Sequence, residues 1–102
     1  MFTVLYRWRL HEGQEQQFID AWSRISDLYL QHRGSLGSRL HRGPDGIWYS
    51  YAQWPSAEAR EAAFTGPKLD EAASRRMSEA IAERFPEIVL ESVADYLVLP
   101  RP

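Results

Sequence analysis

The sequence predicts an α+β fold in the order β-α-β-β-α-β, with a four-stranded antiparallel sheet and helices on one of its faces. Three observations carry this prediction. Residues 46–56 form an aromatic and β-branched run with almost no charge, residues 2–10 alternate apolar and polar side chains, and residues 14–33 repeat apolar side chains at helical spacing. Extended and helical segments therefore alternate as in a split β-α-β arrangement.

Residues 46–56 are predicted to form a central strand, opened by a turn at residues 43–46 and closed by Pro55. Alternate side chains of a strand point to opposite faces. One face here carries two large rings around two small side chains, namely Trp48, Ser50, Ala52 and Trp54. The other face carries Tyr49, Tyr51 and Gln53. Because aromatic groups occupy both faces, we expect this strand to be covered on both sides.

The elements before this strand follow from periodicity. Residues 2–10 are predicted to form a strand, and residues 14–33 an amphipathic helix that ends at Gly34. Residues 36–42 are predicted to form an edge strand, because they contain a glycine, two arginines and a histidine. This strand would pair with the central strand as a hairpin.

The second half begins with a short helix over residues 56–64, for which Ser56 is the predicted N-cap. Gly66 and Pro67 interrupt the helix, and a second helical piece is expected from residue 69 to about residue 84, ended by Pro86. Residues 88–99 are predicted to form the last strand. The chain then ends in a short tail.

The composition narrows the class of protein. A chain of 102 residues has room for one domain, which we place over residues 1–102. With no cysteine it can have neither disulfides nor thiolate metal sites, and a net charge of −2 favours neither nucleic acid nor an anionic membrane as a partner. The first residues lack the pattern of a secretion signal, and no stretch approaches the about 20 apolar residues of a membrane helix. We therefore expect a cytoplasmic protein.

The sheet face turned away from the helices predicts a partner. It would expose Leu5, Tyr49, Tyr51 and several residues of the last strand, which is more apolar surface than a monomer usually leaves in water. A second copy of the chain, related by a two-fold axis, is the simplest cover. We therefore expect a homodimer formed through this face.

Several segments together resemble the antibiotic biosynthesis monooxygenase domain over nearly the whole chain. They are the opening strand, the turn ending at Gly13, the long helix, Gly34-Ser35-Leu36-Gly37-Ser38-Arg39-Leu40-His41 and Tyr51-Ala52-Gln53-Trp54-Pro55-Ser56. The resemblance implies a ferredoxin-like dimeric α+β barrel, in which two sheets pack face to face. It also implies a cavity between sheet and helices in each subunit.

The same family includes cofactor-free monooxygenases that oxidise phenolic polyketides or quinols with O2, and haem-degrading oxygenases. The haem-degrading members carry an Asn on the first strand, then a Trp and a His on the helices after the third strand. The matching positions here are Tyr6, a residue near Ala63, and one near Ala73 or Ser74, and no histidine follows His41. The haem-degrading branch is therefore set aside, which leaves the cofactor-free monooxygenases and the members with no assigned reaction, and no cofactor is expected.

In the cofactor-free reaction the substrate, as a phenolate or enolate, supplies the electron to O2, while the protein stabilises the anion, holds a flat ring and excludes water. The expected walls of the substrate pocket are Tyr6, Trp8, Trp22 and Trp54, and Ser50 is small enough to leave space beside Ala52. Alternatively, these rings only fill the core. If the central strand were turned over, Tyr49 and Tyr51 would enter the pocket and Trp48 and Trp54 would leave it.

Tyr6 and His41 are the candidate catalytic residues. Histidine has an ordinary pKa suited to a general base near neutral pH. His11 lies in a predicted turn and His32 in the last helical turn, where solvated or structural roles are expected. His41 is therefore the remaining histidine candidate. Its position on the same strand as Arg39 places it on the sheet face expected to form the dimer. No metal site is expected, because none of the three histidines is paired with a carboxylate at ligand spacing.

Three functions remain open at this point. The first is a cofactor-independent monooxygenase acting with O2 on a small planar phenolic or quinol-like substrate. The second is a domain of the same fold that binds a small aromatic or hydrophobic molecule without catalysis. The third is a dimerisation module with a filled core, which an open cavity lined by a few polar groups would argue against.

Overall fold

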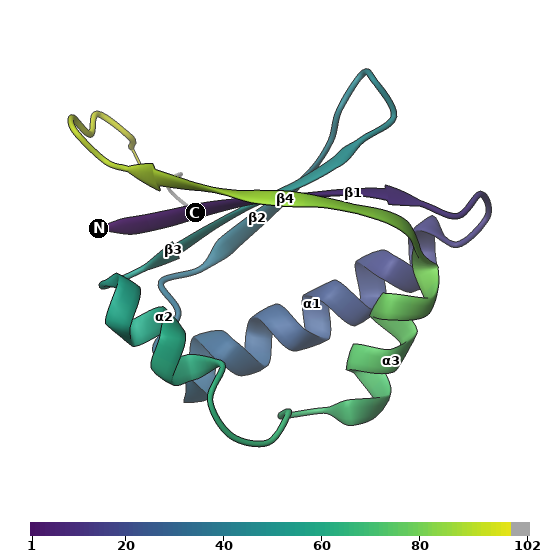
Figure 1. The fold of residues 1–102 in the computed structure, drawn as a ribbon, viewed down its shortest axis with the longest axis horizontal. Helices are drawn as coiled ribbons and strands as arrows, with labels where there is room; N and C mark the ends of the chain where they lie inside the picture. The colour runs from purple at the N-terminus through teal and green to yellow at the C-terminus, as the bar shows by residue number, and fades with distance from the viewer. Residues whose placement is uncertain (99–102) are drawn as a thin grey trace.

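The computed structural model describes residues 1–98 of the chain (Figure 1). Its elements are, in order, β1 (Phe2–Leu10), α1 (Glu15–His32), β2 (Ser38–Arg42), β3 (Trp48–Trp54), α2 (Ala57–Ala63), α3 (Glu71–Ala80) and β4 (Ile81–Glu91). The predicted order of strands and helices is confirmed, with the second helical region divided into α2 and α3. Among residues 1–98, no helix has the length and hydropathy needed to cross a membrane.

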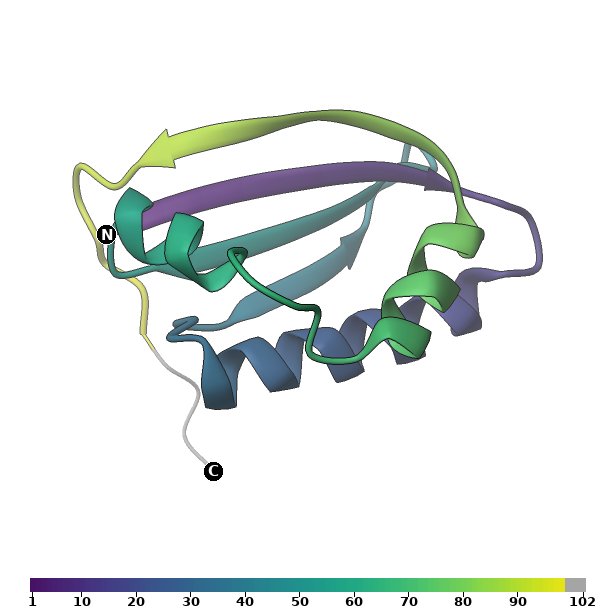
Figure 2. The ribbon, with the colours of Figure 1, turned by 60° about the horizontal axis from the view of Figure 1, so that its bottom comes forward.

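The four strands form one antiparallel sheet in the order β2-β3-β1-β4. β3 lies between two neighbours and β2 lies at an edge, so both of these predictions are confirmed. The helices α1, α2 and α3 all lie on one side of the sheet, below it in Figure 1, and the tilted view in Figure 2 shows the same arrangement. The domain is therefore ferredoxin-like, with one sheet face turned away from the helices.

The tryptophan face of β3 is turned toward the helices. Its residues Trp48, Ser50, Ala52 and Trp54 are all buried, whereas the three residues between them are half-buried. On β1, Trp8 lies opposite Trp48 and Tyr6 opposite Ser50, and residues directly opposite each other share a face. The structure thus places Tyr49 and Tyr51 on the outer face.

The core lies between this sheet face and the helices α1 and α3. It consists of Trp8, Phe18, Trp48 and Ala80. The Phe18 ring is fully buried and meets Trp8 edge-on, with ring centroids 5.1 Å apart, and Trp48 edge-on at 6.2 Å. Edge-to-face contacts of this kind are favoured between aromatic rings. Trp8 and Trp48 therefore contribute to the core.

The last strand differs from its prediction. The helical piece was expected to reach about residue 84 and the strand to span 88–99, but α3 ends at Ala80 and β4 begins at Ile81. Pro86 lies inside the strand rather than ending a helix. Residues 92–98 belong to neither a helix nor a strand, and position 99 lies outside the described residues.

The position of Pro86 has a physical explanation. β4 is an edge strand, and its pairing with β1 shifts, since Leu5 lies opposite Ile88 but Arg7 lies opposite Phe85. Two residues of β4 therefore stand against one residue of β1, which is a β-bulge. A proline at a bulge of an edge strand does not interrupt the ladder, since no N–H is required there. Its carbonyl oxygen accepts a hydrogen bond from Arg7 Nη2 at 2.8 Å.

Candidate functional site

A cavity of about 300 Å³ lies between the helices and the tryptophan face of the sheet. The five residues predicted to shape a substrate pocket all line it: Tyr6, Trp8, Trp22, Ser50 and Trp54. The space exists because the middle of β3 carries the small side chains of Ser50 and Ala52, which cannot reach the helices. That a substrate binds there stays a prediction.

Aromatic rings form two walls of the cavity. On β1, Tyr6 and Trp8 stack with their ring planes 6° apart and their centroids at 5.9 Å. At the other end, the Phe64 ring lies 5.1 Å from Tyr29 and 5.7 Å from Trp54. Tyr29 and Phe64 were not predicted as cavity residues. Tyr29 belongs to the apolar residues that repeat at helical spacing in α1. This spacing predicted that its side chain is buried, but not that it lines a cavity.

One polar contact crosses the cavity from helix to sheet. The indole Nε1–H of Trp22 on α1 donates a hydrogen bond to Ser50 Oγ on β3 at 3.2 Å. Ser50 is only 2% exposed, so this is a polar contact within the protein rather than on its surface. It fixes the Trp22 ring against the sheet and gives the Ser50 hydroxyl a defined partner.

A second polar contact joins Tyr6 of β1 to Arg60 of α2. The Tyr6 hydroxyl oxygen accepts hydrogen bonds from Arg60 Nε at 3.1 Å and from Nη2 at 2.9 Å. Arg60 Nη2 also donates to Glu87 Oε2 of β4 at 2.7 Å. The guanidinium lies between the rings of Tyr6 and Phe64, 5.6 and 5.5 Å from their centroids. Such positions over an aromatic face favour a cation.

The environment changes the proton affinity of both groups. Burial raises the pKa of the Tyr6 phenol above its ordinary value, and the hydrogen bond from Arg60 opposes this only in part. Tyr6 is therefore a phenol rather than a phenolate near neutral pH. Burial disfavours the Arg60 cation, but its hydrogen bonds to Tyr6 and Glu87 outweigh this and raise its pKa.

Arg60 and its partner Glu87 are polar residues of the site that were not predicted from the sequence. The predicted N-cap of α2 is confirmed, because Ser56 Oγ accepts a hydrogen bond from the Ala59 backbone N–H at 3.0 Å. This cap sets the phase of the helix and thus the side of α2 that carries Arg60. The contact with Tyr6 and Glu87 depends in addition on the position of β4, which was predicted incorrectly.

The charges along the cavity wall are all positive. Arg60 and Arg84 line the cavity, whereas the described lining residues include no aspartate, glutamate or histidine. His41, the other catalytic candidate, lies on β2 opposite Tyr49, is exposed, and shares the outer face with that tyrosine. The structure therefore brings Tyr6 to the cavity but leaves His41 outside it.

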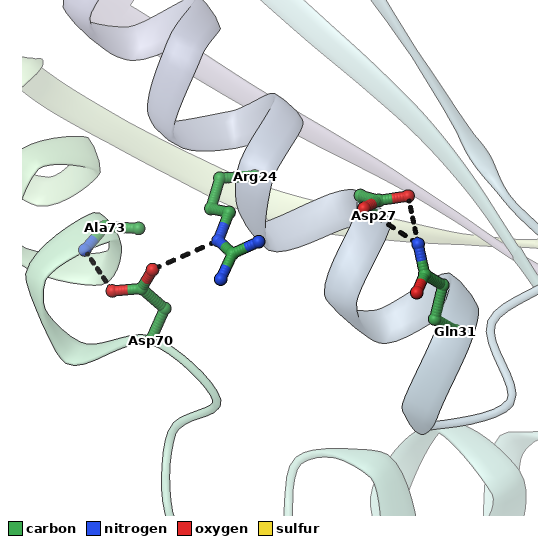
Figure 3. A network of polar contacts seen from close by, with 5 residues as sticks. All are labelled: Arg24, Asp27, Gln31, Asp70 and Ala73. Atoms are coloured by element: carbon green, nitrogen blue, oxygen red, sulfur yellow. Dashed lines mark hydrogen bonds and ion pairs between the residues drawn. The ribbon is translucent and has the colours of Figure 1, made fainter.

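A smaller cavity of about 240 Å³ shares Tyr29, Phe64 and Arg84 with the first and extends toward the start of α3. Asp70, one of its lining residues, connects α3 to α1 (Figure 3). Its Oδ1 accepts a hydrogen bond from the Ala73 backbone N–H at 2.9 Å, and its Oδ2 lies 3.2 Å from Arg24 Nε. The Ala73 N–H and then Arg24 lower the pKa of Asp70 below its ordinary value.

Within residues 1–98 no group of three histidine, aspartate or glutamate side chains lies close enough together to hold a metal ion. The polar groups that face the cavity are hydroxyl, indole and guanidinium groups. Such groups can orient an aromatic ring, donate hydrogen bonds to its oxygen atoms and balance a negative charge.

Comparisons with known proteins agree with this architecture. The family model described as "Antibiotic biosynthesis monooxygenase" matches residues 1–75. No protein of curated function matches the sequence significantly.

Solved structures with the same fold share little sequence with this chain. SnoaB from Streptomyces nogalater, a cofactor-independent oxygenase, has a TM-score of 0.76 at 14% identity, over 93% of this chain and 95% of its own. A candidate antibiotic biosynthesis monooxygenase from Chloroflexus aurantiacus J-10-fl has a TM-score of 0.75 at 16% identity, over 93% and 95%. Another, from Caulobacter crescentus CB15, has a TM-score of 0.77 at 17% identity, over 91% and 90%. At these identities the likeness concerns the fold alone.

Proposed function

Because this chain belongs to the antibiotic biosynthesis monooxygenase family, we propose that it is a cofactor-independent monooxygenase. Its substrate would be a small planar phenolic or quinol-like molecule held between sheet and helices. SnoaB, which shares the fold, is a cofactor-independent oxygenase. That precedent supports the reaction class for this chain.

The cavity is the observation that carries the proposal. Its volume of about 300 Å³ is at the lower end of the range of small-molecule sites, about 300–1,000 Å³. The stacked Tyr6 and Trp8 rings offer a flat surface on one side, and Trp54 with Phe64 closes another. A flat aromatic substrate fits such walls better than an aliphatic chain would.

The proposed reaction balances between the substrate and O2. In an anthrone-like substrate, a methylene between two aryl groups becomes a carbonyl. One oxygen atom of O2 enters the new ketone, and the other leaves as water with the two methylene hydrogens. The substrate supplies all four electrons, so the protein must stabilise the enolate or phenolate and keep out bulk water. Arg60 and the cavity hydroxyls suit the first task, and the rings suit the second.

Oxygen uptake by the purified, metal-stripped protein tests this proposal, with a panel of hydroquinones and anthrones as substrates. Uptake above the spontaneous rate is expected, and Ala52→Leu should abolish most of it by filling the cavity. The matched control is Ala62→Leu, which adds the same side chain at an exposed position of α2 and should keep full activity. Uptake that is absent across the panel, or unaffected by Ala52→Leu, would contradict an oxygenase site in this cavity.

One observation favours the second candidate, a binding domain without catalysis. The described residues that line the cavity include no histidine, aspartate or glutamate, which are the usual general bases. A planar phenol that binds with measurable affinity but consumes no oxygen would favour this function.

We also propose that two copies of the chain associate through the outer face of the sheet. This face carries Leu5, Tyr49 and Tyr51, together with Ile88 and Leu90 of β4, which are 38% and 40% exposed. A stable interface needs about 800 Å² per partner, and a sheet face is flat enough to provide it. Sedimentation should report a dimer that Leu5→Glu converts to a monomer, whereas Ser23→Glu on α1 leaves it intact. A wild-type monomer at micromolar concentration would refute this assembly.

A further inference from the structure

The smaller cavity beside α3 adjoins the first cavity but has no role in the proposed reaction. The two spaces share the side chains of Ile25, Tyr29, Phe64, Met77 and Arg84, which come from α1, the end of α2, α3 and β4. These shared side chains form the boundary between the spaces, and methionine is flexible enough to adapt to a ligand. The smaller cavity adds about 240 Å³ to the about 300 Å³ of the first. A ligand held in the first cavity can therefore extend into the second.

An arginine lies at this boundary, on a sheet face that carries mostly aromatic and small side chains. Arg84 of β4 is paired with Trp8 of β1, so its side chain leaves the face that is turned toward the helices. Its Nη2 donates a hydrogen bond to Ser78 Oγ of α3 at 3.1 Å. A guanidinium has five N–H donors, so most of them remain for another acceptor. The nearby glutamates of the same strand, Glu83 and Glu87, form ion pairs with other arginines.

A second cation lines the smaller cavity from the connection between α2 and α3. Lys68 belongs to this connection, and among residues 1–98 neither Lys68 nor Arg84 forms an ion pair. The connection is fixed to the end of α1 by Arg33. Its Nη1 donates to the Ala63 carbonyl at 2.7 Å, and its Nη2 donates to the Pro67 carbonyl at 3.0 Å. Lys68 follows Pro67 directly, so its backbone is held in a defined place at the cavity.

The one carboxylate among the described lining residues of the smaller cavity is already bound. Asp70 Oδ1 accepts a hydrogen bond from the Ala73 backbone N–H at 2.9 Å, and Oδ2 is paired with Arg24 Nε at 3.2 Å. The Arg24 cation balances the charge of this carboxylate. The charges that this part of the protein leaves without a partner are therefore the two positive ones, on Lys68 and Arg84.

Two such cations select an acidic group on an apolar chain. The planar fork of a guanidinium binds a carboxylate through two parallel hydrogen bonds, and an ammonium adds a compact charge. The apolar side chains of Ile25, Leu28 and Met77 line the same cavity and suit the carbon chain that would carry the carboxylate. Since Arg84 lines both cavities, a chain of a few carbon atoms is long enough to reach it from a ring in the first.

We propose that the smaller cavity binds an acidic side chain of the substrate, a carboxylate joined by a short apolar chain to the planar ring in the first cavity. Arg84 and Lys68 bind this carboxylate. The inference rests on the proposed function and narrows its substrate to planar phenols with an acidic side chain. The carboxylate lies away from the reacting ring and takes no part in the reaction with O2.

The test compares two ligands of the same shape that differ in charge, anthraquinone-2-butanoic acid and its primary amide. Both are already oxidised, so isothermal titration calorimetry at neutral pH measures their binding without turnover. The acid should bind about tenfold more tightly than the amide, a limited preference because Lys68 and Arg84 are exposed and water screens their charges. A preference below about threefold would mean that Arg84 only protects an edge strand, and it overturns the proposal. Failure of the acid to bind overturns it as well.

Charge variants assign the preference to the two cations. Arg84→Gln and Lys68→Gln should each reduce the preference for the acid by about threefold or more, with little change for the amide. Arg75→Gln is the matched control, because Arg75 is an exposed residue of α3 that does not line the cavity. It should keep the full preference, which separates a local contact from the general attraction of a positive surface. An unchanged preference in both cavity variants, or an equal loss in Arg75→Gln, overturns the assignment.

A change of volume tests where the chain lies. Ser74→Leu fills the smaller cavity and should weaken the acid and the amide by about tenfold, because their chains lose their space. The same variant should bind 2-hydroxyanthraquinone, which has no chain, nearly as well as the wild type does. Ala72→Leu, at an exposed position of the same helix, should leave all three affinities unchanged. Equal weakening of all three ligands by Ser74→Leu, or weakening of none, overturns the subsite.

Oxygen uptake separates this proposal from the proposed reaction. A preference for the acid without turnover of any hydroquinone or anthrone refutes the oxygenase alone. Turnover of these substrates with equal affinities for the acid and the amide refutes the acidic subsite alone.

Discussion

The hydrogen bond between Trp22 and Ser50 is the contact on which the geometry of the cavity depends most directly, and its strength can be measured. Ser50→Ala removes the acceptor and leaves a part-buried indole N–H without a partner, which costs about 1–3 kcal/mol. A domain of this size is stable by about 5–15 kcal/mol, so the variant should fold. Its melting temperature should fall by about 4–8 °C for each kcal/mol lost.

A double-mutant cycle isolates this contact. Trp22→Phe removes the donor and part of the ring, and the double variant removes donor and acceptor together, so its cost should be about 1 kcal/mol less than the sum of the single costs. Urea unfolding followed by far-UV circular dichroism gives the three values without relying on tryptophan emission. Ser23→Ala removes an exposed hydroxyl bonded to the Ile19 carbonyl at 2.7 Å and should cost less than about 0.5 kcal/mol. A coupling energy below about 0.3 kcal/mol would refute the Trp22–Ser50 hydrogen bond.

Three further results are expected. Phe18→Ala, at the fully buried centre of the core, should cost about 3–5 kcal/mol in urea unfolding, and a cost below about 1.5 kcal/mol would contradict that packing. Asp70 has a lowered pKa when folded, so its contribution to stability is complete above its unfolded pKa of about 3.9 and is lost as the pH falls through the folded value. Asp70→Asn should flatten this acid dependence in denaturation measured from pH 6 to 2, and an unchanged slope would argue against it. Finally, oxygen uptake with two phenols of different acidity should follow each phenol's own ionisation, whereas a shared midpoint near the histidine value of about 6.5 would indicate a protein base.

The first half of the fold was predictable because its signals are local. The alternation of residues 2–10, the amphipathic stripe of α1 and the aromatic run of β3 each reflect one buried face, and the structure uses those faces as expected. The same alternation placed Trp22, Ser50 and Trp54 together, since a helix that crosses a sheet must meet the inward face of its central strand. Periodicity thus brings these three wall residues together, whereas Tyr29 and Phe64, which form another wall, were not predicted to line the cavity.

The errors arise where the deciding interaction is not local. Pro86 suggests a helix end by its own chemistry, yet it lies in β4 because a bulge opposite β1 accommodates it. The surroundings of Arg60, which binds the Tyr6 hydroxyl, involve that same strand, since Glu87 follows Pro86 and binds Arg60. Because the last strand was predicted to begin too far along the chain, the hydrogen bonds around Tyr6 and Arg60 could not be predicted. An error of seven residues in one strand boundary therefore left the ion pair between Arg60 and Glu87 out of the prediction.

The composition of β3 supports the proposal that the cavity binds a ligand. An unfilled space between sheet and helices forfeits packing contacts of the side chains that line it, which is a cost in stability. Larger β-branched side chains at Ser50 and Ala52 would remove that cost, and a central strand favours them. The chain instead keeps two small residues between Trp48 and Trp54 and lines the space with hydroxyl and guanidinium groups, which water can solvate when no ligand is present. Two small side chains between two tryptophans on one strand face are therefore the sequence feature that most directly supports the proposed binding site.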